Sequence, residues 1–187
     1  LSHTGAPVPN EAPEQTCSTG SCHGGGADID EDEELLEFST SDYSPGDTVD
    51  LTVTVNTDLS ENRFGFQVTA LNSDHQSVGT FDGPSSVTID SVPSGREYTS
   101  AAQFTNESWE FNWTAEEGNG YGDLTFWITA VAFEQDENDS DVKWALSQQL
   151  EQHNRAPSLS SPQVTPDPAS ESDTLEYSVT YTDPDGD

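Results

Sequence analysis

Residues 109–132, WEFNWTAEEGNGYGDLTFWITAVA, decide the expected fold. Their first part alternates Trp109, Phe111 and Trp113 with polar residues, which is the period of a strand with one buried face. A run rich in Gly and acidic residues, 116–123, then indicates a turn. Residues 123–133 follow with apolar side chains on both faces, as in a central strand. The stretch therefore predicts two strands joined by a turn.

Strand patterns continue on both sides of this stretch. Residues 48–56 (TVDLTVTVN) and 63–71 (RFGFQVTAL) alternate apolar and polar positions, and 142–150 (VKWALSQQL) follows the central strand. Turn residues separate these runs, as in SPGD, DGP and PSG. Because no run has the 3.6-residue period of a helix, the sequence predicts an all-β chain with an antiparallel β-sandwich over residues 34–153.

The two ends of the chain differ from this region. Residues 1–33 are irregular and contain both cysteines of the chain. Residues 154–173 are rich in Pro and Ser and are interpreted as a linker. Residues 174–187 alternate again, so we expect either the start of a further β module or a strand that exchanges with another copy of the chain. Self-association through this strand would make the protein a filament or array subunit.

The charge balance is extreme, with 36 acidic and 4 basic residues and a formal net charge of -32. Clustered basic side chains are needed to bind phosphates, so nucleic acid is excluded as a partner, and we do not expect binding to anionic membrane surfaces. No apolar run reaches the length of a membrane span, so we expect no membrane insertion within this chain. A surface this acidic favours a halophilic source, because high salt screens the repulsion between carboxylates.

The segment TCSTGSCHGGG, residues 16–26, is the candidate functional motif. Attachment of a c-type haem needs two thiols and a histidine directly after the second one, and Cys17, Cys22 and His23 meet this requirement. His23 would then ligate the haem iron. A disulfide between Cys17 and Cys22 is the alternative, since local disulfides are common outside the cell. Zinc comes third, because a fourth ligand is needed and zinc cysteines usually lie closer together.

A second axial ligand of a haem would come from histidine, because the chain has no methionine. His3 lies in the same irregular segment as the cysteines and is the first choice. His75, in the polar run NSDHQS, is the alternative, and His153 lies in the linker. Each of these is also compatible with a solvated surface histidine.

Several motifs in the same order resemble a known family. They are TGAP (4–7), TC…CHGG (16–25), YSPGDTVDLTVTV (43–55), FGFQVTAL (64–71) and the stretch 109–132. Over residues 4–150 the chain resembles the choice-of-anchor V domain proteins, which are related to the Reeler-type β-sandwich. The resemblance implies a Reeler- or immunoglobulin-like sandwich in a secreted, surface-attached protein, and a Cys-x-x-Cys-His element of the haem c type. This chain departs from the pattern, because its cysteines enclose four residues and no histidine precedes Trp109 in residues 97–108.

These observations favour an extracellular or cell-surface protein, from which we expect a leader to have been removed. The leading hypothesis is a haem c-bearing sandwich that serves in electron transfer, surface assembly or both. The alternative is a non-redox adhesive or filament module in which Cys17 and Cys22 form a disulfide. No nucleophile–histidine–carboxylate pattern or phosphate loop occurs, so we expect no enzyme.

Three Asn-x-Ser/Thr sequons indicate candidate glycosylation sites at Asn106, Asn112 and Asn138. Asn112 belongs to the tryptophan-rich strand, on the face opposite the aromatic residues. Asn138 belongs to an acidic loop and is therefore the expected acceptor.

Overall fold

A computed structural model describes residues 4–8, 12–14, 35–55, 62–92, 95–118, 120–134, 142–153, 157–165 and 170–182. The chain divides into two compact units, Leu1–Gln152 and His153–Asp187. Throughout these described ranges the regular secondary structure is strand, and no helix occurs. The all-β prediction is therefore confirmed.

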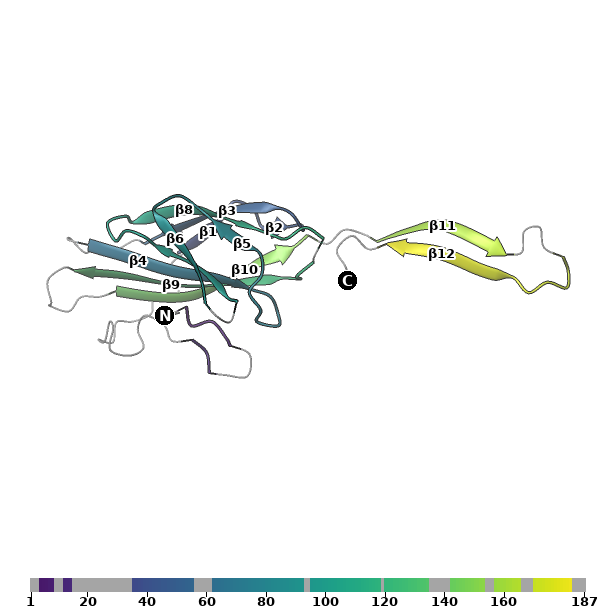
Figure 1. Ribbon diagram of the computed structural model, residues 1–187, viewed down its shortest axis with the longest axis horizontal. Coiled ribbons are helices and arrows are strands. Elements are labelled where there is room, and N and C mark those ends of the chain that lie inside the picture. Colours follow the sequence, from purple (N-terminus) through teal and green to yellow (C-terminus); the bar gives the residue numbers. More distant parts are fainter. Residues whose placement is uncertain are drawn as a thin grey trace. The chain divides into compact units, whose positions relative to one another are not determined.

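The first unit contains strands β1 to β10 (Figure 1). In chain order they are β1 (Leu36–Phe38), β2 (Asp42–Tyr43), β3 (Thr48–Thr54), β4 (Asn62–Leu71), β5 (Thr80–Asp82), β6 (Val87–Ser91), β7 (Glu97–Ala101), β8 (Ser108–Thr114), β9 (Leu124–Glu134) and β10 (Val142–Gln152). The predicted runs 48–56, 63–71, 109–113, 123–133 and 142–150 correspond to β3, β4, β8, β9 and β10.

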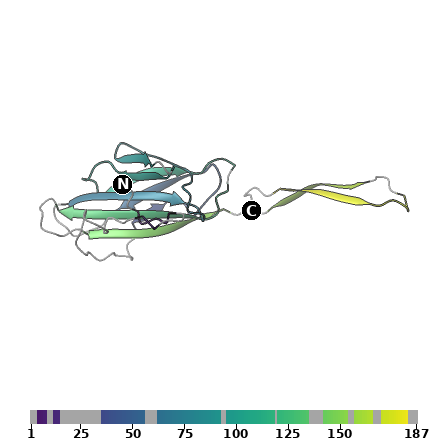
Figure 2. The same cartoon turned by 60° about the horizontal axis from the view of Figure 1, so that its bottom comes forward.

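Two stacked sheets form the sandwich (Figures 1 and 2). One has the order β1-β3-β8-β5 and the other the order β2-β10-β9-β4-β7-β6. Neighbouring strands are antiparallel, except that the two-residue β2 pairs with the end of β10 in parallel. The antiparallel sandwich is thus the observed architecture, with one short parallel pair that the sequence pattern did not predict.

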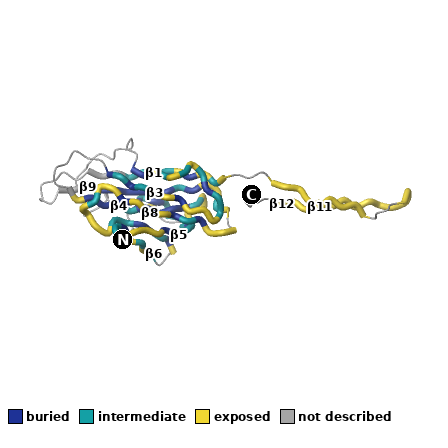
Figure 3. The backbone as a smooth tube through the Cα atoms, turned by 90° about the horizontal axis from the view of Figure 1, so that it is seen from above, coloured by how far each residue is buried: buried dark blue, intermediate teal, exposed yellow. Residues whose placement is uncertain are grey.

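Alternating residues of both sheets fill the space between them (Figure 3). On β3 and β8, register pairs such as Val49–Trp113 and Leu51–Phe111 are buried, while Asp50 and its neighbours on the other face are exposed. Across the sandwich, Phe66 of β4 stacks on Phe111 with ring centroids 5.6 Å apart. The aromatic stripe of the sequence is therefore the core, as its two-residue period predicts.

The second unit is a two-stranded antiparallel sheet of β11 (Ser158–Thr165) and β12 (Glu176–Thr182). Residues 158–165 were expected to be part of a linker, and the structure differs here. Leu159 and Val164 lie opposite Tyr181 and Tyr177, so β12 finds apolar cross-strand partners in β11. Pro162 falls in the register shift between Ser160 and Gln163, where a strand tolerates a residue without an N–H.

Candidate functional site

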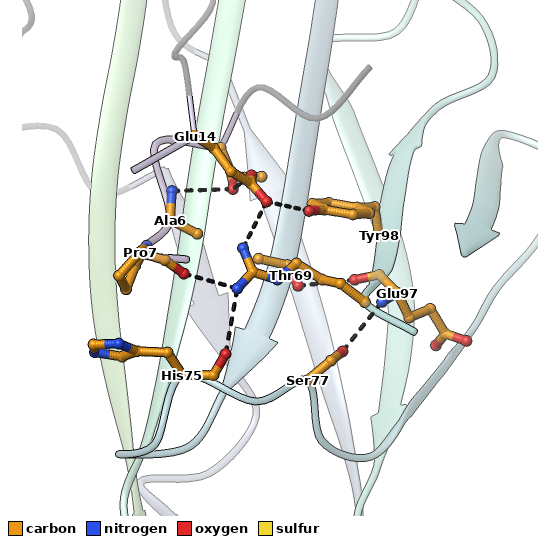
Figure 4. Close-up of polar contacts among 10 residues, drawn as sticks. Ala6, Pro7, Glu14, Thr69, His75, Ser77, Glu97 and Tyr98 are labelled. Atoms are coloured by element: carbon orange, nitrogen blue, oxygen red, sulfur yellow. Dashed lines mark hydrogen bonds and ion pairs between the residues drawn. The ribbon is translucent and has the colours of Figure 1, made fainter. Parts of the chain in front are cut away.

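The polar cluster that holds the N-terminal segment on the sandwich centres on Arg96, which directly precedes β7 (Figure 4). Arg96 Nη1 lies 2.6 Å from Glu14 Oε1, and the two side chains are each only 7% exposed. Arg96 Nη2 donates to the carbonyl oxygens of Pro7 at 2.7 Å and of His75 at 3.3 Å. One guanidinium therefore ties the N-terminal segment to the turn between β4 and β5.

Glu14 receives further hydrogen bonds from two other side chains. Its Oε1 accepts a short hydrogen bond from the Tyr98 hydroxyl of β7, and its Oε2 accepts one from Thr4 Oγ1 at 2.6 Å. The Glu14 N–H donates to the Ala6 carbonyl at 2.9 Å, which closes a turn of the segment on itself. Thr4 and Ala6 are fully buried by these contacts. We call this set, Thr4, Ala6, Glu14, Arg96 and Tyr98, the N-terminal clamp.

The N-terminal clamp is suited to holding structure and unsuited to catalysis. A buried carboxylate is stable when a cation and hydroxyl donors satisfy its oxygens, and both Glu14 oxygens have such partners. The Arg96 guanidinium is likewise occupied by one carboxylate and two carbonyls. The Glu14 carboxylate and the Arg96 guanidinium are therefore engaged with each other and with neighbouring groups of the protein. Their role in this arrangement is to hold the N-terminal segment in place on the sandwich.

Sequence reasoning did not identify the clamp. Glu14 and Arg96 are 82 positions apart, and no local pattern links them. One signal was present, because Arg96 is one of only four basic residues in a chain with 36 acidic ones. An arginine placed beside an alternating strand in so acidic a chain is a reasonable candidate for a buried ion pair.

The candidate haem-attachment residues Cys17, Cys22 and His23 lie outside the described residues, as does His3. Glu14, however, is three positions before Cys17, so the clamp fixes the chain on the sandwich just ahead of the motif. Within the described ranges, no group of three or more His, Cys, Asp or Glu side chains converges to hold a metal ion.

His75 and His153, the two described histidines, lie in different units. His75 is exposed and occupies the turn after β4, where its backbone carbonyl accepts from Arg96 of the clamp. Its φ of 60° is in the left-handed region, and Asn72 Oδ1 supports this turn by accepting from the N–H groups of Asp74 and Gln76. His153 is exposed and begins the second unit. Of the two, only His75 belongs to the region of the N-terminal clamp.

Two of the three sequons fall within the described residues. Asn106 is half-buried in the turn between β7 and β8, and Asn112 is exposed in the middle of β8. Asn138 lies outside the described residues. The part of the chain that the structure describes contains no helix that is long and apolar enough to cross a membrane.

No family model and no curated protein matches this sequence. Among solved structures, the chain is similar to the human F-spondin reeler domain, with 13% identity, a TM-score of 0.48, and coverage of 68% of this chain and 95% of that domain. The Reelin-N domain of F-spondin gives 13% identity, a TM-score of 0.49, and coverage of 68% and 93%. A type II cohesin domain from the cellulosome of Acetivibrio cellulolyticus gives 9% identity and a TM-score of 0.31 over 62% of this chain and 91% of the cohesin. These similarities concern the fold alone.

Proposed function

We propose that this chain is a non-catalytic extracellular surface module that carries one covalent c-type haem at Cys17, Cys22 and His23 and takes part in one-electron transfer. The observation that carries the proposal is the order Cys, Cys, His, with the histidine directly after the second cysteine. A bound haem would supply one-electron redox chemistry. The chain's own contribution is to attach, orient and partly shield that group.

The N-terminal clamp supports this proposal because it joins the motif to a rigid scaffold. Functional groups act best when residues locked by packing hold them in place. Buried Arg96, Glu14 and Tyr98 fix the chain three positions before Cys17 through an ion pair and hydrogen bonds to β7. A group bound at Cys17 and Cys22 would therefore be tethered to the sandwich by a short connection.

His75 is a reasonable source of a second axial ligand. Its exposed side chain lies on a turn that the clamp holds beside the N-terminal segment (Figure 4). His153 belongs to the other unit. His3 remains a candidate for the second axial ligand, because it lies in the same N-terminal segment of the sequence as Cys17 and Cys22. In a haem-loaded protein, His75→Ala would then change the low-spin absorption bands, and His153→Ala would leave them as they are.

Visible absorption tests the proposal after production in a host that matures c-type cytochromes. We expect a Soret band that stays with the protein through acid–acetone extraction, because thioether bonds resist this treatment. A Cys17→Ser/Cys22→Ser double variant should lose the band, while His153→Ala, the matched control, should keep it. A colourless wild-type protein from a host that loads a control cytochrome would contradict haem attachment.

A surface-assembly module, with Cys17 and Cys22 as a disulfide, is the second candidate, and the β11–β12 unit favours it. One face of this sheet is apolar, and its side chains are exposed: Leu159, Val164, Tyr177, Val179 and Tyr181. Leu175, which directly precedes β12, is also exposed. Leu159 and Tyr177 are 70% and 73% exposed. A two-stranded sheet is marginal alone in water, so an apolar face of this kind favours association with another β structure.

Self-association through the C-terminal strand is tested by removing residues 157–187. If β12 mediates assembly, the shortened chain should remain a folded monomer while the full chain assembles in a concentration-dependent way, as measured by sedimentation. Tyr177→Ser and Tyr181→Ser should weaken assembly, and Ser178→Ala and Thr180→Ala on the opposite face should not. Equal assembly of the full and shortened chains would rule out this role.

A further inference from the structure

Phe104 is an exposed aromatic residue in the exposed turn between β7 and β8. It is 49% exposed, and within the described part of the first unit no other large hydrophobic side chain reaches this level. It lies in the turn between β7 and β8, on the polar surface of a chain with a net charge of -32. The exposed part of the ring offers an apolar surface beside the turn, and burying apolar surface is favourable in water.

Backbone hydrogen bonds hold this turn rigidly on the sandwich. The Phe64 N–H of β4 donates to the Phe104 carbonyl at 2.8 Å, and the Val55 N–H donates to the Glu107 carbonyl at 2.9 Å. The phenyl ring itself packs over Gly65, since a Cβ built on that glycine would lie 3.5 Å from two of the ring carbons. The ring is therefore supported by the sheet while about half of its surface stays in water.

Asn106 follows Phe104 by two positions and begins the sequon Asn106-Glu107-Ser108. Asn106 is partly exposed and Ser108 is exposed. Asn106 lies between Phe104 and Glu107, whose carbonyls accept the two hydrogen bonds that hold the turn, and Ser108 follows Glu107. We propose that Asn106 is N-glycosylated and that the first sugar of the glycan packs its C–H face on the Phe104 ring. A pyranose ring has an apolar face of C–H groups, so stacking removes apolar surface of both partners from water.

The chemical step is the ordinary transfer from a lipid-phosphate-linked sugar by a membrane glycosyltransferase. The Asn106 amide nitrogen forms a bond to the anomeric carbon of the sugar, and the bond from that carbon to the lipid phosphate oxygen breaks. The amide loses one proton, and the lipid phosphate leaves with the electron pair. The step needs no redox partner, and the proposal does not rest on the presence of a haem.

Asn112 is a poorer acceptor for reasons that the structure makes clear. It lies in mid-strand on β8, in register with Asp50 on one side and Asp82 on the other. When the oxygen and nitrogen of the Asn112 side-chain amide are exchanged, which gives both atoms suitable hydrogen-bond partners, the nitrogen donates to Asp50 Oδ1 at 3.2 Å. The next residue, Trp113, is fully buried in the core. A glycan on Asn112 would have carboxylates on both sides, those of Asp50 and Asp82.

Glycopeptide mass spectrometry after secretion from a host with N-glycosylation tests this proposal. We expect Asn106 to be occupied in the wild type and its occupancy to fall severalfold in Phe104→Ala but not in Phe104→Tyr. Asn112→Gln is the control and should leave occupancy at Asn106 unchanged. An unoccupied Asn106 in the wild type would overturn the site.

Thermal melting in molar salt separates stacking from a sequence preference of the transferase. The glycosylated wild type should melt at a higher temperature than the same chain made in cells without the transferase. In the glycan-bearing fraction of Phe104→Ala, compared with the same variant without glycan, this difference should disappear, and in Phe104→Tyr it should persist. A glycan at Asn106 that raises the melting temperature equally in wild type and Phe104→Ala would overturn the stacking.

Discussion

Arg96 and Glu14 form a buried ion pair in a chain whose other charges are overwhelmingly acidic. Such a pair stabilises little over a well-packed apolar replacement, because both charges lose their hydration. Its value is specificity: the guanidinium selects one carboxylate, together with the carbonyls of Pro7 and His75, and so fixes where the N-terminal segment lies. The proposed attachment of a haem at Cys17 and Cys22 relies on that placement of the segment.

Replacing Arg96 with Met should strongly destabilise the protein. The buried Glu14 carboxylate would lose its cation, and breaking one partner of such a pair costs about 3–5 kcal/mol. Denaturant unfolding in molar salt measures the change. Arg63→Met is the matched control, because it removes the same charge from an exposed position of β4 and should cost less than about 0.5 kcal/mol. Equal effects of the two substitutions would mean that the clamp contributes nothing specific.

Tyr43 gives the fold a dependence on alkaline pH. Burial raises the pKa of its phenol from 10.0 to about 12, and its hydroxyl donates to the Gly122 carbonyl at 2.7 Å. Because the folded state holds this proton more tightly than the unfolded chain, the phenol stabilises fully below pH about 10 and progressively less as the pH rises toward 12.

Tyr43→Phe should therefore be less stable than the wild type at neutral pH, by about 1 kcal/mol for the lost hydrogen bond. The free-energy gap between the two proteins should narrow as the pH rises from about 10 toward 12, since only the wild type loses the phenol's contribution. Denaturant unfolding at a series of pH values measures the gap. A gap that stays constant up to pH about 12 would contradict a raised pKa of Tyr43.

At the scale of elements, the connection from β4 to β5 depends on one glycine. Gly79 has a φ of +68°, and a Cβ there would lie 2.3 Å from Cε2 of the Trp113 ring. The same tryptophan donates its Nε1–H to the Val78 carbonyl at 2.9 Å, so the turn and the core strand β8 are packed without spare room. The turn that carries His75 ends at this contact.

Gly79→Ala should cost about 3 kcal/mol or more, because strain at a positive φ is added to a clash with a buried ring. Gly118→Ala separates the two causes. Gly118 has a φ of +78° but nothing within 4 Å of a Cβ, so its substitution should cost only about 1–2 kcal/mol. Melting or denaturant unfolding compares the two variants, and similar losses would show that the Trp113 contact is unimportant.

The sequence was most informative where the pattern is local. Alternation in Val49, Leu51, Val53 and in Trp109, Phe111, Trp113 predicted both the strands and their buried faces, because a strand's side chains alternate by geometry. The strand β11 was missed because Pro162 and the three serines before it in the strand are typical of a linker, whereas its pairing with Tyr177 and Tyr181 is not local in the sequence.

The site was less accessible to sequence reasoning than the fold. Cys17, Cys22 and His23 form a motif that can be found by spacing, whereas the clamp that anchors their segment joins positions 14 and 96, which no spacing rule connects. The parallel pairing of β2 with β10 is likewise long-range, since it joins Asp42 and Tyr43 to Glu151 and Gln152. Both features involve the six-stranded sheet, which brings segments that are distant in the sequence together.

For the whole molecule, the net charge of -32 opposes compaction. The Debye length is about 3 Å at 1 M salt and about 30 Å at 0.01 M, so like charges repel across the surface only in dilute salt. The melting temperature should therefore fall as salt is lowered from molar to about 0.01 M. At low salt, lowering the pH toward about 4 should recover part of the loss, because carboxylates become protonated. A melting temperature independent of salt would contradict a halophilic adaptation.

The central claim concerns the chemistry of Cys17 and Cys22, and the intact mass of the denatured, unreduced protein tests it most directly. For protein from a host that matures c-type cytochromes, the account predicts a mass increase equal to one haem, which is lost when Cys17 and Cys22 are both changed to Ser. A loss of two hydrogens would instead identify a disulfide and favour the assembly module. An unmodified mass, with both thiols free, would contradict both functions proposed for the motif.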